Sequence, residues 1–124
     1  MKDVNKFIID ISGTPTLTWL NGLSKGEQAI EELLDIAVAD GVAAVNIIPD
    51  RNYTPGKGME DEKCRKLYEF VEICIKRKLP IIAGTEMNSP GQKFVDDFNS
   101  KELAPLCEEF YKGAMFVYNH TKHL

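Results

Sequence analysis

The segment Pro80-Ile-Ile-Ala-Gly-Thr-Glu-Met-Asn-Ser-Pro-Gly-Gln-Lys-Phe-Val-Asp-Asp97 decides the fold of this chain. Its start is apolar and typical of a buried strand, whereas its continuation is rich in carboxylates, amides and hydroxyls. Parallel strands of α/β folds build binding and catalytic sites at their carboxyl ends. The segment therefore predicts a parallel α/β fold with a site at this edge of the sheet.

Helices and strands alternate in the rest of the sequence. Apolar residues recur at helical spacing, and short β-branched runs lie between these stretches. Ser24 and Glu27 form a capping box at the start of the second helix. The expected elements are a helix from Val4 that ends at Gly13, a strand at 16–20, a helix at 24–40, a strand at 42–48, a loop at 51–59, a helix at 60–78, a strand at 79–87 and a short helix from Asn99 or Ser100 to Gly113. Residues 114–118 fit either a strand or a helix.

This order predicts an α/β fold with a three-stranded parallel βα series, in a single domain that spans residues 1–124. Helices on one side of such a sheet leave its other face and both of its edges uncovered. A second copy of the chain, further sequence or the terminal segment is expected to cover them. The sequence therefore favours a homo-oligomer or a part of a larger fold.

Alternation along the three strands divides their side chains between two faces. Leu17, Val45 and Ile81 belong to an apolar face that suits the helices. Thr18 and Asn46 belong to the opposite face, which is also that of Glu86, and Asp50 and Asn88 lie at its carboxyl end. This convergence is typical of a site, although a sheet face open to solvent shows the same alternation.

Glu86 is the foremost catalytic candidate, because a carboxylate in an apolar strand is costly unless it is paired or bound to a metal. It suits a general base, a ligand of a hard cation or a structural hydrogen-bond partner. Arg51 suits the binding of a substrate carboxylate or phosphate, or a contact with Asp50 in its loop. Asp96 and Asp97 suit either a divalent cation site or an ordinary turn.

Bulk composition excludes several classes of protein. The net charge of −4 disfavours nucleic-acid binding, which normally requires a basic surface. The sequence has no apolar run long enough to span a membrane and no secretory signal, so a cytoplasmic location is expected. The three cysteines form no C-x-x-C pair and are expected to be core thiols.

Three stretches carry a resemblance to a known family: Thr14-Pro-Thr-Leu-Thr-Trp-Leu-Asn-Gly22, Asn46-Ile-Ile-Pro-Asp-Arg-Asn52 and Gly84-Thr-Glu-Met-Asn-Ser-Pro-Gly-Gln-Lys-Phe-Val-Asp-Asp97. Together they resemble the C-terminal portion of a bacterial family of TIM-barrel proteins described as PHP- or amidohydrolase-like metal-dependent hydrolases. The resemblance implies a C-terminal barrel fragment that is inactive alone. In the complete barrel Glu86 would act as base or metal ligand, and the small-molecule substrate would contact Asn46, Asp50, Arg51, Asn88 and Gln92.

The resemblance also implies a divalent metal in the complete barrel. Such hydrolases hold their metals largely through histidines on early strands, and this sequence has no H-x-H pair, so no metal is expected on the chain alone. Two alternatives remain open at this stage. One is a non-catalytic α/β module that self-associates, and the other is a piece of a sugar isomerase- or aldolase-like barrel that uses carboxylates.

Overall fold

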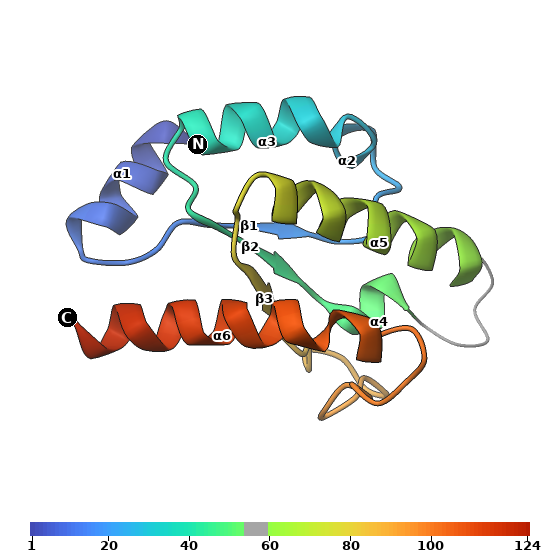
Figure 1. The fold of residues 1–124 in the computed structure, drawn as a ribbon. Helices are drawn as coiled ribbons and strands as arrows, with labels where there is room; N and C mark the ends of the chain where they lie inside the picture. Colours follow the sequence, from blue (N-terminus) through green and yellow to red (C-terminus); the bar gives the residue numbers. More distant parts are fainter. Residues whose placement is uncertain (54–59) are drawn as a thin grey trace.

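The computed structural model describes residues 1–53 and 60–124. Helices and strands alternate in the part of the chain that it describes (Figure 1). In chain order the elements are α1 (Lys2–Asp10), β1 (Thr16–Trp19), α2 (Lys25–Gln28), α3 (Ile30–Ala39), β2 (Ala44–Ile47), α4 (Pro49–Asn52), α5 (Glu60–Lys76), β3 (Ile81–Ala83), the 3₁₀ turn η1 (Ala104–Leu106) and α6 (Cys107–Lys122).

The three strands form one parallel sheet in the order β1-β2-β3. Thr18 lies beside Asn46, and Asn46 lies beside Ile82, so Thr18 and Asn46 share one face of the sheet, as the alternation predicts. The α/β class and the parallel sheet are therefore confirmed. They follow from helical crossovers between successive strands, which place those strands side by side in the same direction.

A single hydrophobic core lies on the face of the sheet that the sequence predicts to be apolar. Val45 and Ile81 are buried there with side chains from α3, α5 and α6. Trp19 stacks on Phe70 of α5, with ring centroids 4.4 Å apart and planes inclined by 7°. On the opposite face Thr16 and Thr18 remain exposed, so none of the described elements covers that face completely.

The free edge of β3 is covered by α6, which corrects the expectation that both edges of the sheet are open. Pro80 O accepts from Val45 N, and Gly84 N donates to Ile47 O, so the backbone polar groups of every second residue from Pro80 to Gly84 point toward β2. The carbonyl of Ile81 therefore points away from β2, toward the free edge. Gly113 of α6 abuts this carbonyl so closely that a Cβ on Gly113 would lie 1.9 Å from Ile81 O.

Other elements differ from their predicted bounds. Residues 114–118 are helical and continue α6 well past the predicted end at Gly113. The helix predicted at 24–40 is interrupted at Ala29, whose ψ of 49° ends α2 before α3 begins. The predicted loop at 51–59 begins inside the short helix α4, and its residues 54–59 lie outside the described residues. The strand predicted at 79–87 is paired only over Ile81–Ala83, so Glu86 lies in the connection that follows β3.

The helix α1 forms where the sequence predicts it, but its apolar face is not buried. Val4, Phe7 and Ile11 are each more than half exposed. The buried residue of this helix is Asn5, whose side-chain amide donates to Asp40 O at 3.0 Å. A polar contact to the end of α3 thus orients α1. No helix in the described part of the chain is long and apolar enough to cross a membrane.

Candidate functional site

The candidate site lies at the carboxyl edge of the sheet, where residues that follow each of the three strands line one pocket. Asn21 follows β1, Asp50 and Arg51 belong to α4 directly after β2, and residues 86–92 follow β3. Pro49 suits the first position of α4, because its fixed φ and missing N–H are tolerated there. The early turn of α4 brings Arg51 toward the end of β3.

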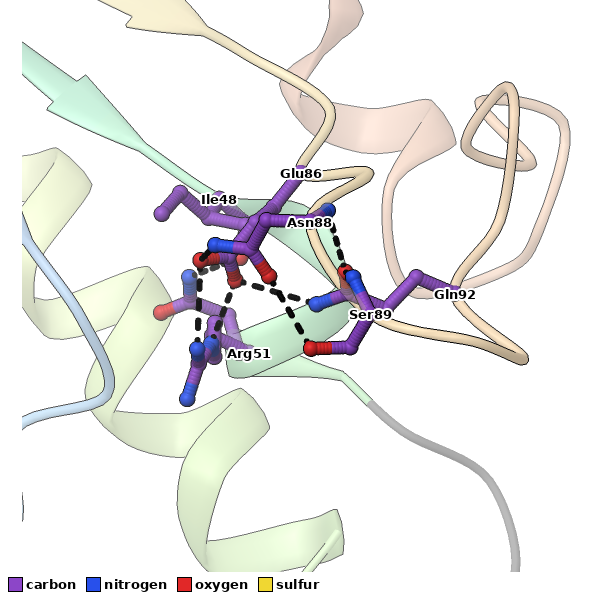
Figure 2. Close-up of polar contacts among 7 residues, drawn as sticks. Ile48, Arg51, Glu86, Asn88, Ser89 and Gln92 are labelled. Atoms are coloured by element: carbon purple, nitrogen blue, oxygen red, sulfur yellow. Dashed lines mark hydrogen bonds and ion pairs between the residues drawn. The ribbon is translucent and has the colours of Figure 1, made fainter.

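Arg51 and Glu86 form the central contact of the site. Arg51 Nε donates to Glu86 Oε2 at 2.7 Å, and Nη2 donates to Oε1 at 3.2 Å, so the guanidinium binds both carboxylate oxygens (Figure 2). The Glu86 side chain is 18% exposed, whereas the Arg51 side chain is 48% exposed. The arginine therefore stands between the carboxylate and solvent.

Two side-chain amides complete the surroundings of Glu86. Asn88 Nδ2 donates to Oε1 at 2.8 Å, and Gln92 Nε2 donates to Oε2 at 3.3 Å. Gln92 Oε1 also accepts from the backbone N–H groups of Asn88 and Ser89, each at 2.7 Å (Figure 2). Each oxygen of Glu86 thus receives two donors, and Gln92 holds the connection after β3 in shape.

This arrangement sets the charge state of the pair. The hydrogen bond from Arg51 is the main cause that lowers the pKa of Glu86 below its ordinary value, and the bonds from Asn88 and Gln92 act in the same direction. The hydrogen bond with Glu86 likewise raises the pKa of Arg51. A carboxylate with a lowered pKa and no open lone pair is a poor general base. The geometry thus favours the structural alternative for Glu86.

A polar pocket of about 370 Å³ lies beside this pair. Its walls come from the connections after all three strands and from the first turns of α5. The lining residues are Asn21, Asp50, Arg51, Lys63, Ser89, Pro90, Gly91 and Gln92. A volume of this size suits a small molecule.

The predicted site residues divide into three groups in the structure. Asp50, Arg51 and Gln92 line the pocket, whereas Glu86 binds the side chains of Arg51 and Gln92, and Asn88 donates to Glu86. Asn46 does not reach the pocket. Its Oδ1 lies beside Gly84 on the less covered face of the sheet.

The pair Asp96 and Asp97 is used in local contacts. Thr85 Oγ1 donates to Asp96 Oδ2 at 2.7 Å, and Asn99 N donates to Asp97 Oδ1 at 3.1 Å. Within residues 1–53 and 60–124 no group of three His, Cys, Asp or Glu side chains is placed to hold a metal ion. The turn interpretation of this pair agrees with these contacts.

Sequence reasoning missed five residues of the pocket, namely Asn21, Lys63, Ser89, Pro90 and Gly91. Lys63 carried a usable signal. It is a cation in the first turns of a helix, where the helix dipole favours anions, and it follows Glu60, Asp61 and Glu62. A lysine that departs from this preference is a candidate for a role other than helix stabilisation.

Comparisons of the chain with protein-family models, with curated proteins and with solved structures find no match.

Proposed function

We propose that this chain is the C-terminal part of a TIM-barrel-type metal-dependent hydrolase-like protein, that it is inactive alone, and that its pocket binds part of a small-molecule substrate. The observation that supports this proposal is the convergence of all three strand connections on one polar pocket. Parallel α/β folds bind their ligands at this edge of the sheet. Asn21, Asp50 and Gln92 each reach the pocket from a different connection.

In this proposal Glu86 is a positioning residue. All four donors around its carboxylate come from the protein itself, so neither a substrate proton nor a metal has direct access to its oxygens. Its task is to hold Arg51 and the connection after β3 in place. Fixing side chains before a ligand arrives lowers the entropic cost of binding.

The described residues do not fit a metal centre. Glu86 is saturated by donors, Asp96 accepts from Thr85, and no other described group offers three ligands. A metal in the complete protein would therefore be held by residues other than these. A closed barrel requires a strand paired with the edge of β3 that α6 covers, so in the proposed complete protein α6 would have to leave this edge.

The proposal is tested by a ligand screen on the full chain. Thermal unfolding is followed with a panel of small neutral and anionic polar compounds, and each compound that raises the midpoint is titrated by calorimetry. Ser89→Tyr places an aromatic ring in the pocket and should abolish binding. Thr121→Tyr makes the same kind of change on α6, near the opposite end of the molecule, and should leave binding unchanged (Figure 1).

Two results would overturn the proposal. One is the failure of every compound to bind the wild-type chain, and the other is equal binding by wild type and Ser89→Tyr. Hydrolysis of ester or amide substrates by the chain alone would contradict the expectation that it is inactive by itself.

A further inference from the structure

Two cationic side chains from different elements line the same pocket. Arg51 comes from α4, and Lys63 comes from the first turns of α5. Lys63 forms no ion pair with any residue that the structure describes, although it follows three acidic residues in the sequence. Asp50 is the one acid among the described lining residues. The described walls carry two cationic side chains and one acidic side chain, and of the two cations Arg51 is paired with Glu86, which lies outside the lining.

The Glu86 carboxylate leaves part of the Arg51 guanidinium available. A guanidinium has five N–H donors, and Glu86 engages Nε and Nη2 only. The described residues offer no hydrogen-bond partner to Nη1. The planar fork of an arginine suits the paired oxygens of a carboxylate or phosphate. Because Glu86 fixes the plane of the guanidinium, the free donors are oriented before a ligand binds.

A neutral donor lines the same pocket as these cations. Asn21 Oδ1 accepts from Leu23 N at 3.1 Å, so the amide nitrogen of Asn21 remains the group that can donate to a ligand. Ser89 also lines the pocket, and its hydroxyl donates to Asn88 Oδ1 at 3.3 Å. Two cations and the amide N–H groups of Asn21 are complementary to a negatively charged oxygen group.

We propose that this pocket binds an oxyanion, the carboxylate or phosphate group of a small molecule, through Arg51 and Lys63. This inference rests on the proposed function and specifies the ligand class of the same pocket. Arg51 binds the oxygens through its free donors, and Lys63 supplies a second charge from α5. All of the lining residues belong to this chain, so binding is measurable without any further part of a larger protein.

The experiment titrates the full chain with inorganic phosphate, with citrate and with glucose, followed by calorimetry and by backbone amide chemical shifts. Lys63→Gln and Arg51→Gln each remove one pocket charge. Arg65→Gln is the matched control, because it removes the same charge from α5 at an exposed residue that pairs with Glu69. We expect about a tenfold or greater loss of phosphate or citrate affinity in the two pocket variants and less than about a twofold loss in the control.

The two oxyanions separate the two sources of the group, since binding of phosphate alone indicates a phosphate ligand and binding of citrate alone indicates a carboxylate. Equal losses in Lys63→Gln and Arg65→Gln would show a general charge effect and overturn the inference. Glucose binding that is retained in both pocket variants and lost in Ser89→Tyr would overturn the inference and leave the proposed function standing. Absence of binding by all three probes overturns the inference. If no compound of the wider screen binds either, the proposed function fails with it. If Arg51→Gln fails to fold, the change in phosphate or citrate affinity caused by Lys63→Gln alone tests the inference.

Discussion

Replacement of Gly113 by alanine should destabilise the protein through one contact. Gly113 lies in the middle of α6, where alanine would ordinarily stabilise a helix by about 1 kcal/mol. The new Cβ would lie 1.9 Å from Ile81 O and 2.5 Å from Ile81 C. These are backbone atoms of β3, so no side-chain rotation relieves the overlap. To restore an ordinary van der Waals contact, α6 must move away from β3 by about 1.5 Å.

The expected loss follows from that movement. Overpacking against a fixed neighbour costs ~1–3 kcal/mol. Partial loss of the burial of Leu106 and Phe110, which belong to the same core, adds roughly 2 kcal/mol. After subtraction of the helix-propensity gain, we expect Gly113→Ala to lower the free energy of unfolding by about 3 kcal/mol. For a chain of this length that corresponds to a fall in Tm of roughly 10 °C.

Urea and thermal unfolding, followed by circular dichroism and by the fluorescence of Trp19, measure this change. Trp19 is the single tryptophan of the chain and stacks inside the core, so its signal reports on unfolding of the core. Gly26→Ala is the control, because Gly26 is also helical and a Cβ there meets nothing within 4 Å. The control should be unchanged or more stable by about 0.5 kcal/mol. If Gly113→Ala is as stable as the control, then α6 does not rest against the edge of β3.

Glu86→Gln should lower Tm by a few degrees at neutral pH, because it removes an ion pair; the effect is small because the arginine is partly solvated. Since the pKa of Glu86 is lowered, the difference from wild type should shrink as the pH falls below the ordinary carboxyl value of 4.5 and vanish once the pH is below the lowered pKa. An unchanged or higher Tm at pH 7 would refute the structural role. Burial raises the pKa of the Cys74 thiol from 9.0 to about 12, so the free energy of unfolding should fall as the pH rises between these values. Alkylation at pH 8 followed by mass spectrometry should find Cys74 unmodified in the folded protein, and rapid labelling would contradict its burial. Calorimetric titration with zinc or manganese should show weak binding or none, whereas stoichiometric sub-micromolar binding that Glu86→Gln abolishes would be incompatible with the saturated carboxylate. Sedimentation over a concentration series should reveal a dimer or larger species, because one sheet face is incompletely covered and the apolar face of α1 is exposed, and a monomer at every concentration would rule this out.

Local patterns predicted much of the fold because their causes lie within a few residues. Ser24 accepts from Glu27 N at the start of α2, as the capping box requires. Alternation correctly assigned Val45 and Ile81 to the core face, since successive side chains of a strand point to opposite sides. The residues that line the pocket after β2 and β3 were partly predicted for the same reason. A polar segment that follows a buried parallel strand lies at the carboxyl edge of the sheet.

The partners within the site were not predictable in the same way. Arg51 and Glu86 are 35 residues apart, and their contact depends on the crossover through α5 and on the short helix α4. The sequence left Glu86 open as a base, a ligand or a structural partner. The choice between these depends on the donors that the fold brings to its oxygens. Lys63 entered the site only because the first turns of α5 face the connections after β1 and β3.

The sequence by itself determined the alternation of helices and strands, the parallel sheet and the polarity of its carboxyl edge, because backbone periodicity and side-chain chemistry act over short distances. The tertiary structure decided how β3 ends, which residues surround Glu86 and what covers the sheet. Val4 and Phe7 have the spacing of a buried helix face and yet remain exposed, whereas Gly113 has the character of a helix end and instead lies against the edge of β3. Burial and edge coverage depend on which surfaces meet when the whole chain packs, and a periodic pattern contains no information about the surface that will face it.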